Sequence, residues 1–128
     1  VHLGQKDISK KKIHKILAKK KFLGITCHNS RNLVKKAINF KPNYISFGSF
    51  FNTKTKKTKH KATVKNINWF KKNFKLPCAA IGGINMKNCS KILMTDCDLL
   101  TVSSGVWDYK EGPVKAVNFF YKILNKKI

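Results

Sequence analysis

The stretch that decides the fold is PCAAIGGI, residues 77–84, a short apolar run that ends in two consecutive glycines. Its apolar residues are continuous and do not alternate with polar ones, which is typical of a strand covered on both faces. Four further runs of this kind occur along the chain. The predicted strands are Val1–Gly4, Phe22–Cys27, Tyr44–Gly48, Pro77–Ile81 and Leu99–Ser103.

Amphipathic segments separate these strands, and each places apolar residues at helical spacing. Ser9 is placed to cap the first segment, Asn29 or Ser30 the second, and Pro113 opens the last, where proline is common at a helix start. The predicted apolar stripes are Ile13, Ile16 and Leu17; Leu33, Val34, Ala37 and Ile38; Val64 and Ile67; Met86, Cys89 and Ile92; and Val114, Val117, Tyr121 and Leu124.

Alternating strands and helices predict an α/β fold with a parallel sheet and right-handed crossovers. The strands start at residues 1, 22, 44, 77 and 99, and the one long gap holds an insertion rich in Lys and Thr at residues 52–61. This spacing suits both a (β/α) barrel and an open doubly wound sheet. Because the first strand begins at Val1 itself, we expect further units upstream.

Charge is the most unusual property of the composition. Lys and Arg total 28 against 5 acidic residues, which gives a formal net charge of +23. Such a chain invites a nucleic-acid interpretation, since basic side chains release counterions from a phosphate backbone. Arg31 is the only arginine, however, and the lysines are spread over nearly every helical segment. We therefore expect a lysine-rich solvated surface and no nucleic-acid partner.

Hydrophobic residues make up 42% of the chain, enough for a core, and no apolar run is long enough to cross a membrane. The four cysteines, Cys27, Cys78, Cys89 and Cys97, contain no CxxC pair and indicate neither a zinc site nor a disulfide framework. A reducing cytoplasm is the compartment that fits them best.

Polar or glycine-rich residues follow every predicted strand. In a barrel these loops share one mouth, where active sites lie, although Gly, Asn and Ser also form ordinary turns. The clusters are Gln5-Lys6-Asp7, Thr26-Cys27-His28-Asn29, the segment 49–57, Gly82-Gly83-Ile84-Asn85 and Ser103-Ser104-Gly105.

Two of these loops have the chemistry of a phosphate cradle. Gly82-Gly83 can bring backbone N–H groups and a helix N-terminus close to an anion, and Ser103-Ser104-Gly105 has the same character. The last two loops of a barrel often share one phosphate.

The Lys/Thr-rich insertion is a second candidate for binding phosphate. Thr53 and Thr55 point to the same side of an extended chain, and Lys56 adds a charge beside them that would stabilise a departing pyrophosphate. A solvated lysine loop is the competing interpretation.

Asp7 is the candidate metal ligand. It is one of the few acidic residues and follows a strand, and Mg²⁺ commonly takes one or two carboxylates together with substrate phosphates. Capping of the next helix explains the same residue equally well. His28 could act as an acid or base, but a lone histidine at a strand end is more often structural.

Taken together, VHLGQKD (1–7), GITCHN (24–29), GSFFNTKTK (48–56), AIGGI (80–84) and VSSGV (102–106) strongly resemble the thiamine phosphate synthase family over essentially the whole chain. The resemblance implies a TIM (β/α)8 barrel, of which residues 1–128 would form the C-terminal part of a single domain and supply the last five units. The implied reaction joins hydroxymethylpyrimidine diphosphate to thiazole phosphate and releases pyrophosphate.

The resemblance also implies roles for individual residues. Asp7 matches a Mg²⁺ ligand, and Thr26 matches the hydroxyl residue near the pyrimidine and diphosphate. Thr53, Thr55 and Lys56 match the loop that binds the phosphate groups. Gly83, Ser103 and Ser104 match the cradle for the thiazole phosphate. Thr26 and Lys56 would act in catalysis, with Lys56 and Mg²⁺ stabilising the leaving diphosphate.

The chain departs from the family pattern in two respects. It lacks the family's Gln/Arg/Lys cluster and Asn-Asp pair, and Asn52 replaces the usual proline. We therefore expect the 128 residues alone to lack synthase activity, and a partial barrel to associate with itself through exposed strand edges. The alternatives are a thiazole tautomerase, which shares a histidine at His28 but generally lacks Asp7 and the TxTK loop, and a noncatalytic basic nucleic-acid-binding module.

Overall fold

The computed structural model describes residues 1–53, 57 and 59–126. Its centre is a parallel sheet of five strands in the order β1-β2-β3-β4-β5, so each strand pairs with the next one along the chain. The strands are β1 (His2–Leu3), β2 (Gly24–Thr26), β3 (Tyr44–Phe47), β4 (Cys78–Ile81) and β5 (Leu99–Thr101). All five predicted strands are confirmed, each somewhat shorter than the apolar run that indicated it.

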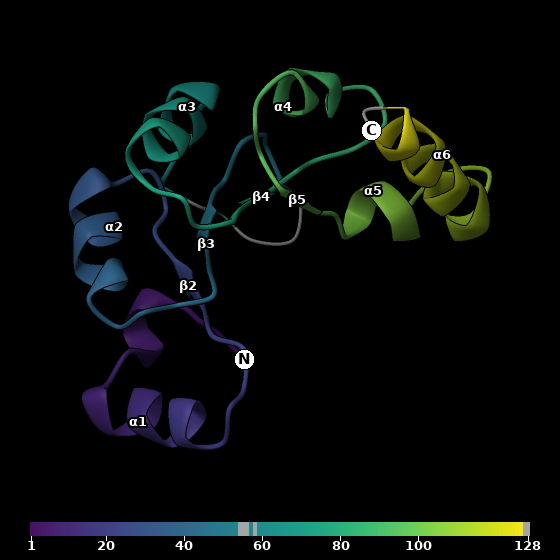
Figure 1. Ribbon diagram of the computed structural model, residues 1–128. Coiled ribbons are helices and arrows are strands. Elements are labelled where there is room, and N and C mark those ends of the chain that lie inside the picture. The colour runs from purple at the N-terminus through teal and green to yellow at the C-terminus, as the bar shows by residue number, and fades with distance from the viewer. Residues whose placement is uncertain (54–56, 58, 127–128) are drawn as a thin grey trace.

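The helices lie along one side of this sheet and form an arc around the strands (Figure 1). They are a 3₁₀ turn η1 (Gln5–Asp7), followed by α1 (Lys10–Ala18), α2 (Arg31–Ile38), α3 (Val64–Asn73), α4 (Ser90–Leu93), α5 (Ser104–Trp107) and α6 (Pro113–Asn125). None of the helices in the described ranges combines the length and hydropathy needed to cross a bilayer.

Local signals in the sequence set the starts of these helices. The Oγ of Ser9 accepts a hydrogen bond from the N–H of Lys12 at 3.2 Å, and the Oγ of Ser30 accepts one from Leu33 at 3.2 Å. These contacts satisfy first-turn N–H groups that have no partner within the helix. Pro113 occupies the first position of α6, as predicted.

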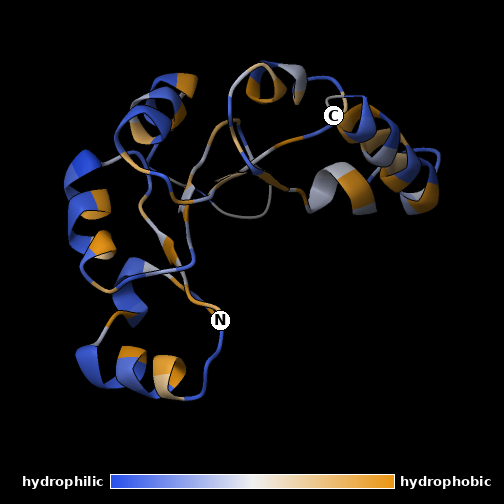
Figure 2. Cartoon of the chain, viewed as in Figure 1, coloured by the Kyte–Doolittle hydropathy of each residue, from blue (hydrophilic) through white to orange (hydrophobic). Residues whose placement is uncertain are grey.

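The core lies between the sheet and the helical arc. The side chains of β1 to β4 that face the helices are buried, and Phe47 of β3 packs edge-on against Phe70 of α3 with ring centroids 5.7 Å apart. In Figure 2 the hydrophilic residues of α2 lie on the side turned away from the strands. Ser46 and Thr95 are the only polar side chains buried within the described ranges, so the lysines there lie at or near the surface.

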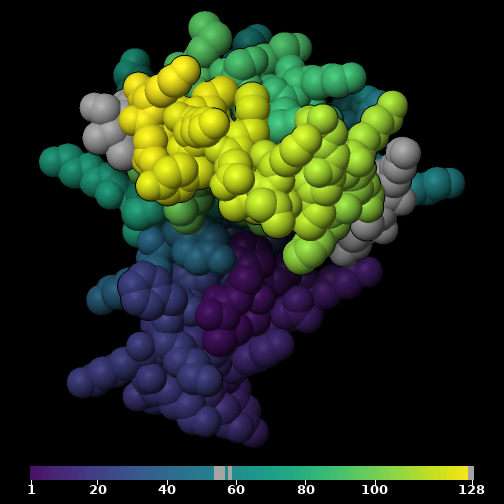
Figure 3. Space-filling model, turned by 90° about the vertical axis from the view of Figure 1, so that its right-hand side faces the viewer, coloured from purple at the N-terminus to yellow at the C-terminus, as the bar shows by residue number. Residues whose placement is uncertain are grey.

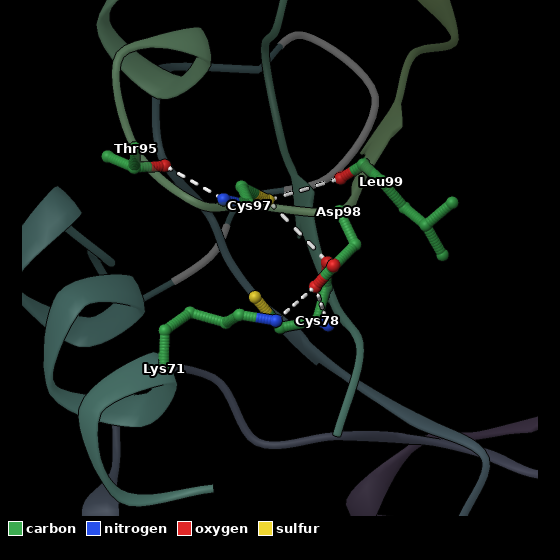
Figure 4. A network of polar contacts seen from close by, with 6 residues as sticks. All are labelled: Lys71, Cys78, Thr95, Cys97, Asp98 and Leu99. Atoms are coloured by element: carbon green, nitrogen blue, oxygen red, sulfur yellow. Dashed lines mark hydrogen bonds and ion pairs between the residues drawn. The ribbon is translucent and has the colours of Figure 1, made fainter. Parts of the chain in front are cut away.

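A polar network ties β5 to β4 and α3 (Figure 4). The Oδ2 of Asp98 accepts hydrogen bonds from the Nζ of Lys71 and the N–H of Cys78, both at 2.9 Å. Burial raises the pKa of Asp98, but the two hydrogen bonds and the charge of Lys71 outweigh it, and the net pKa lies below its ordinary value. The Sγ of Cys97 donates toward the carbonyls of Cys78 and Leu99 at 3.6 and 3.4 Å.

The sheet is open, with β1 and β5 as its edges, so the described chain does not form a closed barrel by itself. One predicted helix is shorter than its apolar stripe indicates. The fourth helix is a single turn, because Asn85 and Asn88 hold the residues before it in hydrogen-bonded turns.

The stripe predicted on the last helix is not part of the core. Helix α6 packs through Ala116 and Phe120, whereas the stripe faces solvent and α6 lies uncovered on the face shown in Figure 3. The exposed fractions along the stripe are 72% for Val114, 52% for Val117, 68% for Tyr121 and 41% for Leu124. The helix is apolar on two sides, and one of them has no neighbour within the described chain.

Candidate active site

The predicted site residues that the structure describes follow the carboxyl ends of the strands. Asp7 ends the 3₁₀ turn after β1, Thr26 is the last residue of β2, and Gly83 follows β4. Ser103 and Ser104 lie where α5 begins after β5. Because all five strands are parallel, these residues lie toward one edge of the sheet.

Neighbouring loops contact one another along this edge. The amide Nε2 of Gln5 donates to the carbonyl of Thr26, which joins the loops after β1 and β2. The N–H of Gly48 donates to the carbonyl of His28 at 3.0 Å.

The contacts continue through the last three loops. The N–H of Phe51 donates to the carbonyl of Gly82 at 3.0 Å. A side chain at Gly105 would lie 2.3 Å from the carbonyl oxygen of Ile84, so the last two loops pack directly together. The five loops thus form one continuous rim.

The two glycines after β4 permit the loops after β3 and β4 to lie close together. Gly82 and Gly83 adopt φ values of +106° and +62°, which disfavour residues with a side chain. A Cβ on Gly83 would lie 2.4 Å from the carbonyl oxygen of Asn52. The predicted helix N-terminus does not directly follow them, since α4 begins only at Ser90, and any anion here would depend on loop N–H groups.

Beside the glycines, the loop after β3 encloses a cavity of about 590 Å³. Its lining is Ser49, Phe50, Phe51, Asn52, Thr53, Lys57, His60 and Lys61. Thr53 therefore lies beside this open pocket, together with Lys57 and Lys61. Thr55 and Lys56 lie outside the described residues.

Asp7 has a structural partner. Its Oδ2 accepts the N–H of Gly4 at 3.2 Å and closes the turn that follows β1. The carboxylate remains exposed, so the cap and a role as a metal ligand are compatible. No cluster of three or more metal-binding side chains exists within the described ranges.

The structure adds a group that sequence reasoning missed, on the sheet face opposite the helices. The Nδ1 of His2 lies 2.9 Å from the hydroxyl of Tyr44, and its Nε2 lies 2.7 Å from the Oγ1 of Thr26. Partial burial lowers the pKa of His2, which favours the neutral imidazole at physiological pH.

Only the register of β1, β2 and β3 brings these residues together. His2 pairs with Gly24, which pairs with Tyr44, and side chains two residues apart on a strand share a face. The only sign of this group in the sequence was that His2, Thr26 and Tyr44 are polar or aromatic residues at the ends of three predicted strands. His28 belongs to a separate group, since its ring stacks on that of His60 with centroids 4.1 Å apart.

The sequence is similar to those of known thiamine-phosphate synthases. Residues 1–106 match the family described as thiamine monophosphate synthase. The thiamine-phosphate synthase of Pelagibacter ubique is 45% identical over 117 residues, covering 91% of this chain and 56% of that protein. The corresponding protein of Rhodospirillum centenum is 34% identical, over 97% of this chain and 60% of its own length.

A solved structure of the same kind of protein has a similar fold. A thiamine phosphate pyrophosphorylase from Pyrococcus furiosus superposes on the whole chain with a TM-score of 0.83 and 25% identity, and 60% of that protein is covered. The chain therefore spans a little over half the length of the relatives that it matches. With the family match over residues 1–106, these similarities establish that the chain belongs to the thiamine monophosphate synthase family.

Proposed function

We propose that this chain supplies part of a thiamine phosphate synthase, a transferase that joins hydroxymethylpyrimidine diphosphate to thiazole phosphate with loss of pyrophosphate. The observation that carries the proposal is the continuous rim of five loops after five parallel strands, in a chain that superposes over its full length on the Pyrococcus pyrophosphorylase. Small phosphorylated molecules are the partners that such a rim accommodates.

The chemistry of this reaction requires stabilisation of charge and no nucleophilic side chain. As the pyrimidine diphosphate ionises, negative charge grows on the departing pyrophosphate, and cations and hydroxyls placed beside it lower the barrier. Thr53, Thr55 and Lys56 are proposed for that role. Thr26 is proposed to hold the pyrimidine, and Gly83, Ser103 and Ser104 the phosphate of the thiazole.

The carboxylate of Asp7 is a suitable ligand for a magnesium ion. Mg²⁺ prefers oxygen ligands and often uses few protein carboxylates, because substrate phosphates and water complete its shell. The exposed carboxylate of Asp7 at the rim offers one such ligand. When bound, the ion would add positive charge next to the diphosphate.

We further propose that the five β/α units are part of a TIM barrel. Sequential strand order with all helices on one side supports a barrel over a doubly wound sheet, whose helices cover both faces. The open edges of β1 and β5 and the exposed stripe of α6 are the surfaces that further β/α units would cover. In their absence, we expect two copies to associate through the same surfaces.

The reaction is assigned to the cytoplasm, a reducing compartment that suits four free thiols. A tautomerase-like barrel and a basic nucleic-acid-binding module are less favoured, because the matched relatives are synthases.

Activity is tested in a chimera. The chain is joined to the part of the Pelagibacter relative that the alignment leaves unmatched, and thiamine phosphate formation is measured with both substrates and Mg²⁺. We expect synthesis that is lost in Asp7→Asn and Lys56→Ala chimeras. A folded chimera that forms no thiamine phosphate, or one that is indifferent to both substitutions, would contradict the assignment.

The isolated chain is tested by ligand binding. Thiazole phosphate at a hundredfold excess over its dissociation constant should stabilise the fold by about 2.7 kcal/mol, and the effect should survive moderate salt. Salt-sensitive binding of duplex DNA without any effect of thiazole phosphate would favour the basic module, since counterion release dominates such binding.

A further inference from the structure

Tyr44, His2 and Thr26 form a chain of hydrogen bonds on the open face of the sheet. The imidazole of His2 bridges the two hydroxyls, with 2.9 Å to Tyr44 and 2.7 Å to Thr26. Both distances lie within the normal range for strong hydrogen bonds. Three adjacent strands contribute one residue each, so the spacing is set by the sheet and not by a loop.

A neutral imidazole makes this series of hydrogen bonds directional. One ring nitrogen then donates a proton and the other accepts one. The two hydroxyls must therefore differ: one donates to His2, and the other accepts from it. Which nitrogen is protonated depends on the partner that each nitrogen meets.

Two observations select the direction. The phenol of Tyr44 is more acidic than an aliphatic hydroxyl and is the better donor, which favours donation to Nδ1. The Oγ of Ser46 lies 3.5 Å from both the Oγ1 of Thr26 and the Nε2 of His2. When Nε2 carries the proton it has no lone pair to offer Ser46, so the Ser46 hydroxyl can donate only to Thr26. The Nε2–H of His2 and the hydroxyl of Ser46 then occupy the lone pairs of the Thr26 oxygen.

We propose that Tyr44 and His2 are positioning residues that hold the hydroxyl of Thr26 as a hydrogen-bond donor, with its proton directed away from the strand and toward the ligand. Thr26 then recognises an acceptor atom and disfavours a donor at the same place. This deepens the proposed function, because it states what the ligand must offer at the end of β2. It also assigns a use to His2, which contacts Thr26, and to Tyr44, which contacts His2.

The proposal is tested by the protonation state of His2 in the 128-residue chain without any ligand. Nitrogen-15 NMR of the imidazole at neutral pH distinguishes the two tautomers, and a His2→Gln variant identifies the signal among the four histidines. We expect the proton to reside mainly on Nε2. The Tyr44→Phe variant retains the ring but removes the donor to Nδ1, and should lower the ratio of the Nε2–H to the Nδ1–H tautomer roughly twofold to tenfold, the equivalent of one hydrogen bond.

The matched control is Tyr109→Phe, which removes a hydroxyl that contacts Glu111 and not His2. It should leave the tautomer ratio of His2 unchanged. A majority of His2 protonated on Nδ1, or a ratio that does not respond to Tyr44→Phe, overturns the proposal. Since no ligand takes part, either result leaves the synthase assignment standing, and an inactive chimera leaves the tautomer result standing.

Discussion

Gly24 lies directly beneath the ring of Tyr44, and a Cβ at Gly24 would come within 2.2 Å of the Cζ of that ring. The absence of a side chain on β2 is what lets the tyrosine lie across the sheet and reach His2. The position of Tyr44 beside His2 therefore depends on glycine at position 24, and this dependence can be tested directly.

Replacing Gly24 with alanine should therefore displace Tyr44. We expect Gly24→Ala to lower the free energy of unfolding by about 1–3 kcal/mol, as overpacking commonly does. Urea denaturation measures the change. The double variant Gly24→Ala/Tyr44→Ala should lose no more stability than Tyr44→Ala alone, because the clash is then absent. A Gly24→Ala protein as stable as the parent would show that the ring has room elsewhere.

Gly83→Ala should weaken binding of thiazole phosphate. Its φ of +62° disfavours alanine, and the added Cβ would lie 2.4 Å from the carbonyl oxygen of Asn52, so the loops after β3 and β4 must separate. We expect the dissociation constant, measured by calorimetry, to rise at least about tenfold, the equivalent of a 1.4 kcal/mol loss.

The control for this variant is Gly112→Ala. Gly112 has a φ of +91° but no atom within 4 Å of the added Cβ. It should cost roughly 1–3 kcal/mol of backbone strain and leave the affinity unchanged. Equal affinities of the Gly83→Ala protein and the parent would remove Gly83 from the proposed cradle.

Asp98→Asn should weaken the fold near neutral pH and not in acid. The pKa of Asp98 is depressed in the folded state, so its charge contributes stability above the ordinary carboxyl pKa and loses it as the pH falls through the depressed value. Because the side chain is 37% exposed, the contribution should be about 0.5 kcal/mol.

Urea denaturation at pH 7 and at pH 2 measures this difference. The asparagine oxygen can still accept from the N–H of Cys78, so the comparison isolates the charge. Asp108→Asn, outside this network, serves as the charge-matched control. A loss of equal size at both pH values would indicate a packing effect and not the ion pair with Lys71.

The stripe on α6 should mediate self-association. Val117 and Tyr121 are 52% and 68% exposed on the same side of the helix, and burying such residues against a second copy is favourable. In sedimentation velocity, the parent should sediment faster with increasing concentration, whereas Val117→Ser/Tyr121→Ser should remain a monomer. Met94→Ser, which alters an 88% exposed apolar residue off the stripe, should behave as the parent.

The fold was largely predictable because each strand is a short apolar run bounded by turn residues. The runs ending at Phe47 and Ile81 specify parallel, doubly covered strands through composition alone. Ser9 and Ser30 likewise mark helix starts by a hydrogen bond that depends only on neighbours in the chain. Interactions between such near neighbours can be predicted from a single sequence.

The misses depend on long-range packing. His2 showed no partner in the sequence because its contacts with Thr26 and Tyr44 span 24 and 42 residues and exist only in the observed register. The stripe through Val117 was assigned to the core because periodicity reveals an apolar side but not what lies against it. The proposed roles of Asp7, Gly83 and Ser104 are still predictions.

The strictly sequential strand order has a consequence for how the chain acquires its structure. Every pairing in the sheet links one strand to the next, so no strand has to wait for a distant segment, and the entropy of closing each loop stays modest. The strands can pair one after another, and a further β/α unit could be added at either free edge of the sheet without rearranging the strands already paired.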